Sequence, residues 1–177
     1  SPLAECVLPH VLALATVHDA SITLLQVLEP GPERSATTFS DPLDLRLDSV
    51  IADAYLAEVA QRLSRVGVLV ETATLNGPAA EQIVAFARRT DVDLIVMSSH
   101  GKRGLSEWNV SSVTQKVVLR APRSVMIVRA YAARQEGQEL ALYHRVLVPL
   151  DGSQRAEYVL PAAVSVARAH DAALVPA

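Results

Sequence analysis

An internal repeat with a spacing of 152 residues sets the organisation of this chain. Residues 1–25 align with residues 153–177 without a gap. Ten of the 25 aligned positions are identical, namely Ser1, Ala4, Glu5, Val7, Leu8, Pro9, Ala15, His18, Asp19 and Ala20. The second copy follows HRVLVPLDG, an apolar run ending at Asp151-Gly152 that is typical of a strand. The repeat therefore predicts a unit that begins with a strand and continues into a helix.

We expect three segments from this repeat. Residues 1–130 would form one unit that lacks its first strand, residues 131–144 a linker, and residues 145–177 the first strand and helix of a second unit. Alternatively, the strand RVLVPLD completes the first unit. It could do so in the same chain, as in a circular permutation, or in a neighbouring chain, as in a domain swap. The sequence leaves these arrangements open.

Strand and helix patterns alternate along the first unit. Helices are expected at 2–17, 42–66, from Pro78 to about Arg89, and at 112–120, and strands at 21–27, 68–73, 93–98 and 124–129. The expected core-facing residues are Leu3, Val7, Val11 and Leu14 in the first helix, and Leu47, Ile51, Tyr55, Val59, Leu63 and Val66 in the second. Such alternation predicts an α/β fold with a doubly wound, Rossmann-like parallel sheet of five strands.

Composition narrows the class of protein. Half of the residues are apolar, 4% are aromatic and the formal net charge is −3, which argues against a nucleic-acid or anionic-membrane partner. No apolar run is long enough to cross a bilayer. The single cysteine, Cys6, excludes an internal disulfide and fits a reducing compartment, so a cytoplasmic location is expected.

The stretch MSSHGKRGLSEWNVSSVTQKV, residues 97–117, carries the strongest functional signal. It runs from a buried strand through a turn rich in small residues to a helix opened by Ser111 and Ser112. Free N–H groups and the positive end of the helix dipole would point at this turn, which is a suitable arrangement for an anion. Gly101 would let the backbone approach that anion closely. The phosphates of a nucleotide are the expected occupant.

With these residues identified, the chain resembles the universal stress protein family, in its tandem-domain form. The resemblance rests on DLIVMSSHGKRGLSEW, on DGS followed by the VLPxA helix, and on APRSVMIVR. The nucleotide-binding branch of that family carries Gly-x-x-Gly, nine residues, then Gly-Ser or Gly-Thr. Here Gly101 and Ser112 match the pattern, whereas Ser98 and Ser111 stand where the family has glycine. If either serine needed a left-handed backbone, the strain would be on the order of 1–2 kcal/mol.

The resemblance implies an adenine nucleotide alpha-hydrolase-like fold and a site for ATP with a magnesium ion bridging its phosphates. By position, the implied contacts are Asp151 and Val27 on the adenosine side and Met97, Ser98, Gly101, Ser111, Ser112 and Val113 around the phosphates. The resemblance also implies a homodimer formed through the strand 124–129, whose apolar edge would invite pairing with a second copy.

Several polar residues near the turn have plainer readings. Lys102 and Arg103 are expected to be a solvated pair rather than a phosphate contact. His100 is expected to make a structural contact rather than to act as a general base, and Trp108 is expected to pack in the fold rather than to stack on a base. The pairs His18-Asp19 and His170-Asp171 fit helix ends better than a metal site.

The expected function is an ATP-binding regulatory module of the stress response without a catalytic site, since no hydrolase or phosphate-loop motif is present. The alternative is a dimeric scaffold of the same fold that binds no nucleotide, with Ser98 and Ser111 marking a lost site. Slow ATP hydrolysis is a third reading, but no positioned base for water is evident in the sequence.

Overall fold

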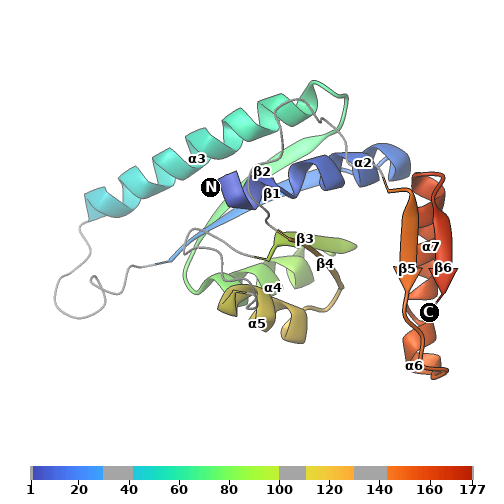
Figure 1. The fold of residues 1–177 in the computed structure, drawn as a ribbon. Coiled ribbons are helices and arrows are strands. Elements are labelled where there is room, and N and C mark those ends of the chain that lie inside the picture. Colours follow the sequence, from blue (N-terminus) through green and yellow to red (C-terminus); the bar gives the residue numbers. More distant parts are fainter. Residues whose placement is uncertain (1, 30–41, 100–110, 130–142, 177) are drawn as a thin grey trace.

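The computed structural model describes residues 2–29, 42–99, 111–129 and 143–176 (Figure 1). The first part of the chain contains α1 (Pro2–Glu5), α2 (Leu8–His18), β1 (Ile22–Leu28), α3 (Pro42–Ser64), β2 (Val70–Asn76), α4 (Ala79–Arg89), β3 (Leu94–Ser98), α5 (Ser112–Arg120) and β4 (Ser124–Val128). The C-terminal unit contains β5 (Arg145–Val148), α6 (Gln154–Glu157), α7 (Leu160–Ala169) and β6 (Ala173–Pro176). Of the predicted linker 131–144, residues 131–142 lie outside the described residues.

The first predicted helix is in fact two helices. We expected one helix over residues 2–17, but α1 ends at Glu5 and α2 begins at Leu8. Pro9, at the second position of α2, has no N–H to offer the carbonyl of Glu5, and its ring crowds that carbonyl. The repeat carries the same break, because α6 ends at Glu157 and α7 begins at Leu160, just before Pro161.

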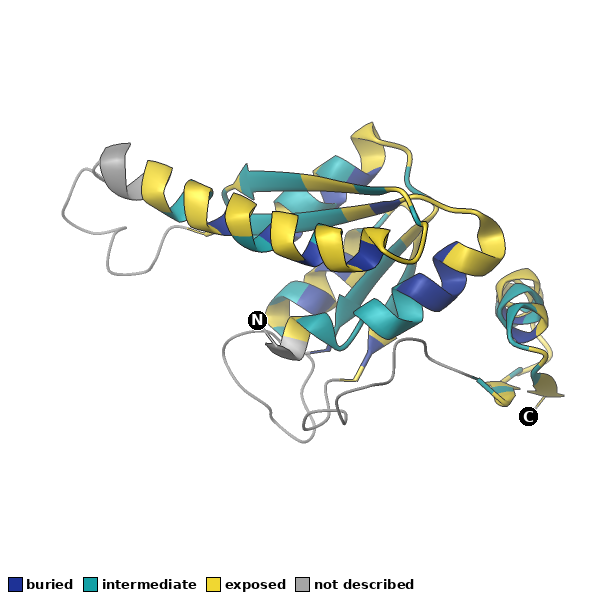
Figure 2. Ribbon diagram, turned by 90° about the horizontal axis from the view of Figure 1, so that it is seen from above, coloured by how far each residue is buried: buried dark blue, intermediate teal, exposed yellow. Residues whose placement is uncertain are grey.

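The main core lies between α2, α3 and β1. Its buried members are Leu12, Ala15, Ile22, Val59 and Leu63. The predicted core face of this helix is correct at Val59 and Leu63. It is wrong at Leu47, Ile51 and Val66, which are 58%, 59% and 46% exposed. The first half of α3 extends past the strands that it covers (Figure 1), so apolar side chains there meet solvent. Figure 2 shows the buried positions recurring along one side of α3.

The strands form three separate parallel pairs: β1 with β2, β3 with β4, and β5 with β6. In Figure 1, α3 lies above β1 and β2, while α4 and α5 lie below, which is the layering of a doubly wound fold. The predicted single sheet of five strands is not formed, because no described strand lies between β1 and β3. The strand RVLV, β5, pairs instead with β6 of its own repeat.

The C-terminal unit sits beside α2, apart from β3 and α5, in both Figure 1 and Figure 2. His18 Nε2 lies 3.3 Å from Ser165 Oγ of α7. The Tyr143 hydroxyl, just before β5, hydrogen-bonds His10 Nδ1 of α2. The ring of Tyr143 also stands edge-on to His170, with centroids 4.5 Å apart. Burial lowers the pKa of His170. These contacts hold the start of β5 against the outer flank of α2.

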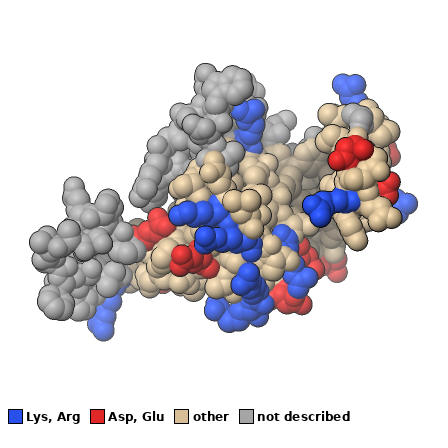
Figure 3. Space-filling model, turned by 90° about the horizontal axis from the view of Figure 1, so that it is seen from below, with Lys and Arg blue, Asp and Glu red and all other residues tan. Residues whose placement is uncertain are grey.

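Two further observations bear on partners. No helix in the described part of the chain is both long and apolar enough to cross a membrane. Basic side chains on the α4–α5 side are interspersed with acidic ones (Figure 3). Arg88, Arg89 and Arg120 lie in the last turns of α4 and α5, where they complement the negative ends of the helix dipoles. Arg120 therefore lies at the opposite end of α5 from its predicted anion site.

Candidate functional site

The candidate site is the junction where β3 ends and α5 begins. Backbone hydrogen bonds close the base of the connecting turn: Ser111 N–H donates to Ser99 O at 2.9 Å, and Ser99 N–H donates to Val128 O at 2.8 Å. Both ends of the turn are thereby tied to the carboxyl ends of β3 and β4. In open α/β sheets this edge is where ligands bind. His100, Gly101, Lys102, Arg103 and Trp108 lie outside the described residues.

Ser111 is the N-cap of α5. Its Oγ accepts from Thr114 N–H at 3.2 Å and lies 2.8 Å from the Thr114 hydroxyl. Thr114 Oγ1 in turn donates to Ser98 O at 3.2 Å, and its side chain is almost fully buried. A short chain of hydrogen bonds thus links the helix start to the end of β3. Thr114 was not among the predicted site residues, although an N-cap serine commonly accepts from the N–H three residues further on, which Thr114 supplies here.

The serine at 111 costs no backbone strain. Its φ is −57° and its ψ is 149°, which any L-residue adopts readily at an N-cap. The left-handed conformation that we considered for this position does not occur. Ser98 is an ordinary β3 residue paired with Val128. The replacement of glycine by serine at these two positions therefore leaves the local backbone intact.

The start of α5 retains donors for an anion. Thr114 N–H is taken by the cap, whereas Ser112 and Val113 occupy the first two helical positions, whose N–H groups have no acceptor within the helix. The Ser112 side chain is exposed and adds a hydroxyl beside them. No acidic residue lies in the first turn of α5. Two N–H groups, one hydroxyl and the positive end of a helix dipole therefore lie together at the start of α5.

Met97 and Val27 lie on the neighbouring strands. Met97 is half-buried in β3, and Val27 is half-buried near the end of β1, paired with Leu75. Both strands run in the direction that brings their carboxyl ends to the same side as the start of α5. The structure thus brings together Met97, Ser98, Ser111, Ser112 and Val113, with Val27 on the adjoining pair of strands.

Asp151 is not brought to this junction. It lies in the C-terminal unit between β5 and α6, and its Oδ1 accepts from Ser153 N–H at 2.9 Å. Hydrogen bonds from the Ser153 side chain and backbone hold the pKa of this exposed carboxyl below its usual value. Asp151 therefore carries a negative charge at neutral pH. A shallow groove between α2 and α7, lined by Val17, His18 and Arg168 among others, is also remote from α5.

The described residues contain no group of three or more histidine, cysteine, aspartate or glutamate side chains that could hold a metal ion. In particular, His18-Asp19 and His170-Asp171 sit at helix ends, where Asp19 and Asp171 adopt φ values of 50° and 49°. This left-handed conformation is common after helices and suits aspartate better than most residues.

The layering and the strand–turn–helix junction define an α/β protein of the doubly wound class. Comparison with known proteins identifies the family: residues 1–129 match the model of the universal stress protein family. The chain belongs to that family. It is 29% identical over 145 residues to Universal stress protein MJ0577 of Methanocaldococcus jannaschii. The alignment covers 73% of this chain and 89% of that relative.

A universal stress protein of Thermus aquaticus is 34% identical over 119 residues, covering 66% of this chain and 83% of the relative. Among solved structures, that of MJ0577 has a TM-score of 0.58 at 27% identity. The match covers 71% of this chain and 91% of the MJ0577 chain. A universal stress protein of Archaeoglobus fulgidus has a TM-score of 0.69 at 24% identity and covers 99% of this chain but 64% of its own. Another, from the same organism in complex with dAMP, has a TM-score of 0.53, also at 24% identity, and covers 72% of this chain and 88% of its own.

Proposed function

We propose that this chain is a nucleotide-binding regulatory module that takes ATP at the start of α5. The observation that carries the proposal is the pair of N–H groups at Ser112 and Val113, which open a helix at the carboxyl end of β3. The complex of an A. fulgidus relative with dAMP, and that of a further universal stress protein with cAMP, support an adenine nucleotide as the ligand.

The residues present fit the phosphate part of the ligand. The Ser112 hydroxyl and the two N–H groups would donate hydrogen bonds to phosphate oxygens, and Ser111 would hold the helix start in place through its cap. Because the described part of the junction offers no carboxylate or histidine cluster, a magnesium ion would be held by the phosphates themselves. The chain would act through occupancy: bound ATP would alter the surface around α5 that a partner recognises, without turnover.

The test removes one of the two N–H groups. Val113→Pro deletes the second N–H of α5, and the helix should tolerate it because α2 and α7 already carry proline at the same position. We expect ATP affinity, measured by calorimetry, to fall by about tenfold or more, which corresponds to roughly 1.4 kcal/mol. Ser112→Ala is the matched control, because it keeps the N–H and removes only the hydroxyl, so its loss should be smaller.

A folded wild-type chain that shows no binding at millimolar ATP would rule the proposal out. So would equal affinity in the wild-type and Val113→Pro chains, because the ligand would then sit elsewhere. Magnesium dependence is checked in the same titration with and without a chelator.

The second candidate is a dimeric scaffold that binds no nucleotide. Ser111 Oγ is already engaged with Thr114, and Ile127 on β4 is 39% exposed at the strand through which a second copy could pair. Under this reading the chain would be a dimer that Ile127→Lys dissociates, and ATP would neither bind nor raise its melting temperature.

A further inference from the structure

Histidines gather where the C-terminal unit meets α2. The chain has five histidines, of which His100 lies outside the described residues. His10 and His18 lie on α2, His170 follows the last residue of α7, and His144 comes directly before β5. Imidazole changes its charge close to neutral pH. Histidines that meet at a contact between two units can therefore make the strength of that contact depend on pH.

The ring of Tyr143 touches a histidine from each unit. Its hydroxyl hydrogen-bonds His10 Nδ1 of α2, and the two ring centroids lie 5.6 Å apart. The same ring meets the His170 ring at 86°, with centroids 4.5 Å apart. Tyr143 is thus wedged between α2 and the end of α7, at the place where the C-terminal unit lies beside α2 in Figures 1 and 2.

One nitrogen of His170 fits only a neutral ring. Its Nε2 is shielded from solvent and has no hydrogen-bond partner among the described residues. A neutral imidazole tolerates this position, because Nε2 can be the nitrogen that carries no proton. An imidazolium carries a proton on both nitrogens, so it would leave a buried N–H unpaired, which is costly. The docked unit therefore selects the neutral form of His170.

The charges around His170 do not offset this cost. The titratable groups on the surrounding elements are His10 and His18 of α2, Tyr143 and His144 before β5, Arg145 of β5, and Arg168 and Asp171 beside His170 itself. Asp171 is the one acid in this set. Burial is nevertheless the cause of the lowered pKa of His170, and it acts against the charged form.

The other histidine contacts at this junction tolerate a proton. His18 is the counterpart of His170 at the spacing of 152 residues, but it is exposed, and its Nε2 lies 3.3 Å from Ser165 Oγ of α7. A hydroxyl can accept as well as donate, so this contact persists when His18 is charged. The same holds for the Tyr143 hydroxyl beside His10. Of the two repeat-related histidines, only His170 opposes protonation.

The joint between the helices is also open. A shallow groove runs between α2 and α7, and its apolar lining includes Val17, Pro161 and Val164, none of which is buried. Protein interiors that hold elements firmly are close-packed. The contacts of Tyr143 and Ser165 therefore carry much of the attachment.

We propose that the contact between the C-terminal unit and α2 is a pH-sensitive latch, which opens when His170 takes up a proton. A free histidine titrates near pH 6.5, so above this pH His170 is neutral in both the docked and the released unit, and the latch is closed. Below it, the released unit binds the proton more readily than the docked one. The docking equilibrium then shifts toward release, by at most about tenfold for each pH unit, because one proton is taken up.

NMR titration tests the linkage directly. The ring protons of His170, identified by their absence from His170→Phe, are followed from pH 8 to pH 5. We expect the pKa of His170 to lie below about 6.5 in the wild type. Tyr143→Ala removes the contacts with both histidines, so the pKa of His170 should move back toward that value. Equal midpoints in the two chains would overturn the proposal.

Small-angle X-ray scattering measures the release itself. We expect the radius of gyration to rise between pH 7.5 and pH 5 in the wild type. His18→Gln is the matched control and should expand in the same way. His170→Phe keeps a ring against Tyr143 but cannot be charged, so it should stay compact throughout. Circular dichroism of the same samples distinguishes release from unfolding.

Three results would contradict the latch. The first is a wild type of constant dimensions over this pH range. The second is a His170→Phe chain that expands as the wild type does. The third is an expansion that comes with loss of helix, because acid would then unfold the chain rather than release the unit. No nucleotide is present in these measurements, so their outcome is independent of the proposed ATP site.

Discussion

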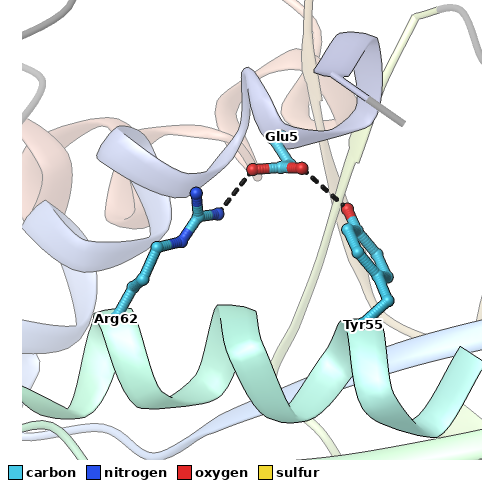
Figure 4. Close-up of polar contacts among 3 residues, drawn as sticks. All are labelled: Glu5, Tyr55 and Arg62. Carbon is cyan, nitrogen blue, oxygen red and sulfur yellow. Dashed lines mark hydrogen bonds and ion pairs between the residues drawn. The ribbon is translucent and has the colours of Figure 1, made fainter.

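Glu5 of α1 forms an ion pair with Arg62, which lies near the end of α3 and donates a hydrogen bond to its carboxylate (Figure 4). Its other carboxylate oxygen accepts from the Tyr55 hydroxyl at 2.9 Å. Tyr55 and Arg62 lie seven residues apart, so both side chains project from the same face of α3. The four-residue helix α1 is thereby attached to α3 by one carboxylate.

Removing this carboxylate should destabilise the chain. Burial acts to raise the pKa of Glu5, but hydrogen bonds from Arg62 and Tyr55 outweigh it, and the net shift is downward. Glu5→Gln replaces two charge-assisted bonds by weaker ones, so we expect the free energy of unfolding to fall by about 1 kcal/mol. Urea denaturation measures this loss.

The repeat provides the control for Glu5. Glu157 is its counterpart in α6, and its side chain is exposed. Glu157→Gln should leave the free energy of unfolding within about 0.5 kcal/mol of the wild type. Equal losses in both variants would mean that the Glu5 contacts add nothing beyond helix propensity.

Tyr55 should make stability fall in alkaline solution. Burial, followed by the hydrogen bond to Glu5, raises the pKa of Tyr55 to about 12. A raised pKa in the folded chain adds stability that is present below the unfolded value of about 10 and is lost as pH rises toward the folded value. Between these limits, the free energy of unfolding should decline more steeply in the wild type than in Tyr55→Phe. Tyrosinate absorbance should show one late-titrating tyrosine that the variant lacks.

The two halves of α3 should lose very different amounts of stability from the same substitution. Leu63 is 4% exposed in the core between α2, α3 and β1, whereas Leu47 is 58% exposed. Leu63→Ala leaves a cavity and should cost about 2–5 kcal/mol, while Leu47→Ala should cost less than about 0.5 kcal/mol. Denaturation midpoints of the two variants provide the comparison. A large loss at Leu47 would show that the exposed half of α3 is covered in solution.

This contrast also shows where sequence reasoning succeeds. Helical spacing located α3 and placed Val59 and Leu63 correctly, because both lie over the strands. It failed at Leu47 and Ile51, since periodicity shows which residues share a face but not whether anything packs on that face. The break between α1 and α2 was readable from Pro9 and from its repeat Pro161, but the apolar pattern running through it suggested one helix.

In the candidate site too, local features were predictable from the sequence and tertiary placement was not. The start of the helix near Ser112 was predicted, because the capping chemistry of serine is local. The position of Asp151 was left open, because the sequence did not decide which strand β5 joins; the structure pairs β5 with β6. Local chemistry is readable from sequence, whereas the placement of a strand depends on tertiary contacts such as that of Tyr143 with His10.

The cap of α5 should contribute to stability independently of any ligand. Ser111→Ala removes the acceptor for Thr114 N–H and leaves the buried Thr114 hydroxyl with Ser98 O as its described partner. Loss of an N-cap serine typically costs about 1 kcal/mol, so the melting temperature should fall by a few degrees. Ser111→Asp should recover much of this loss, because aspartate also caps helices. Its negative charge would repel phosphate, so ATP binding should weaken even though the fold is restored. Thermal unfolding and ATP calorimetry on the same two variants separate the roles. If Ser111→Asp bound ATP as tightly as the wild type, the phosphates could not lie at the start of α5.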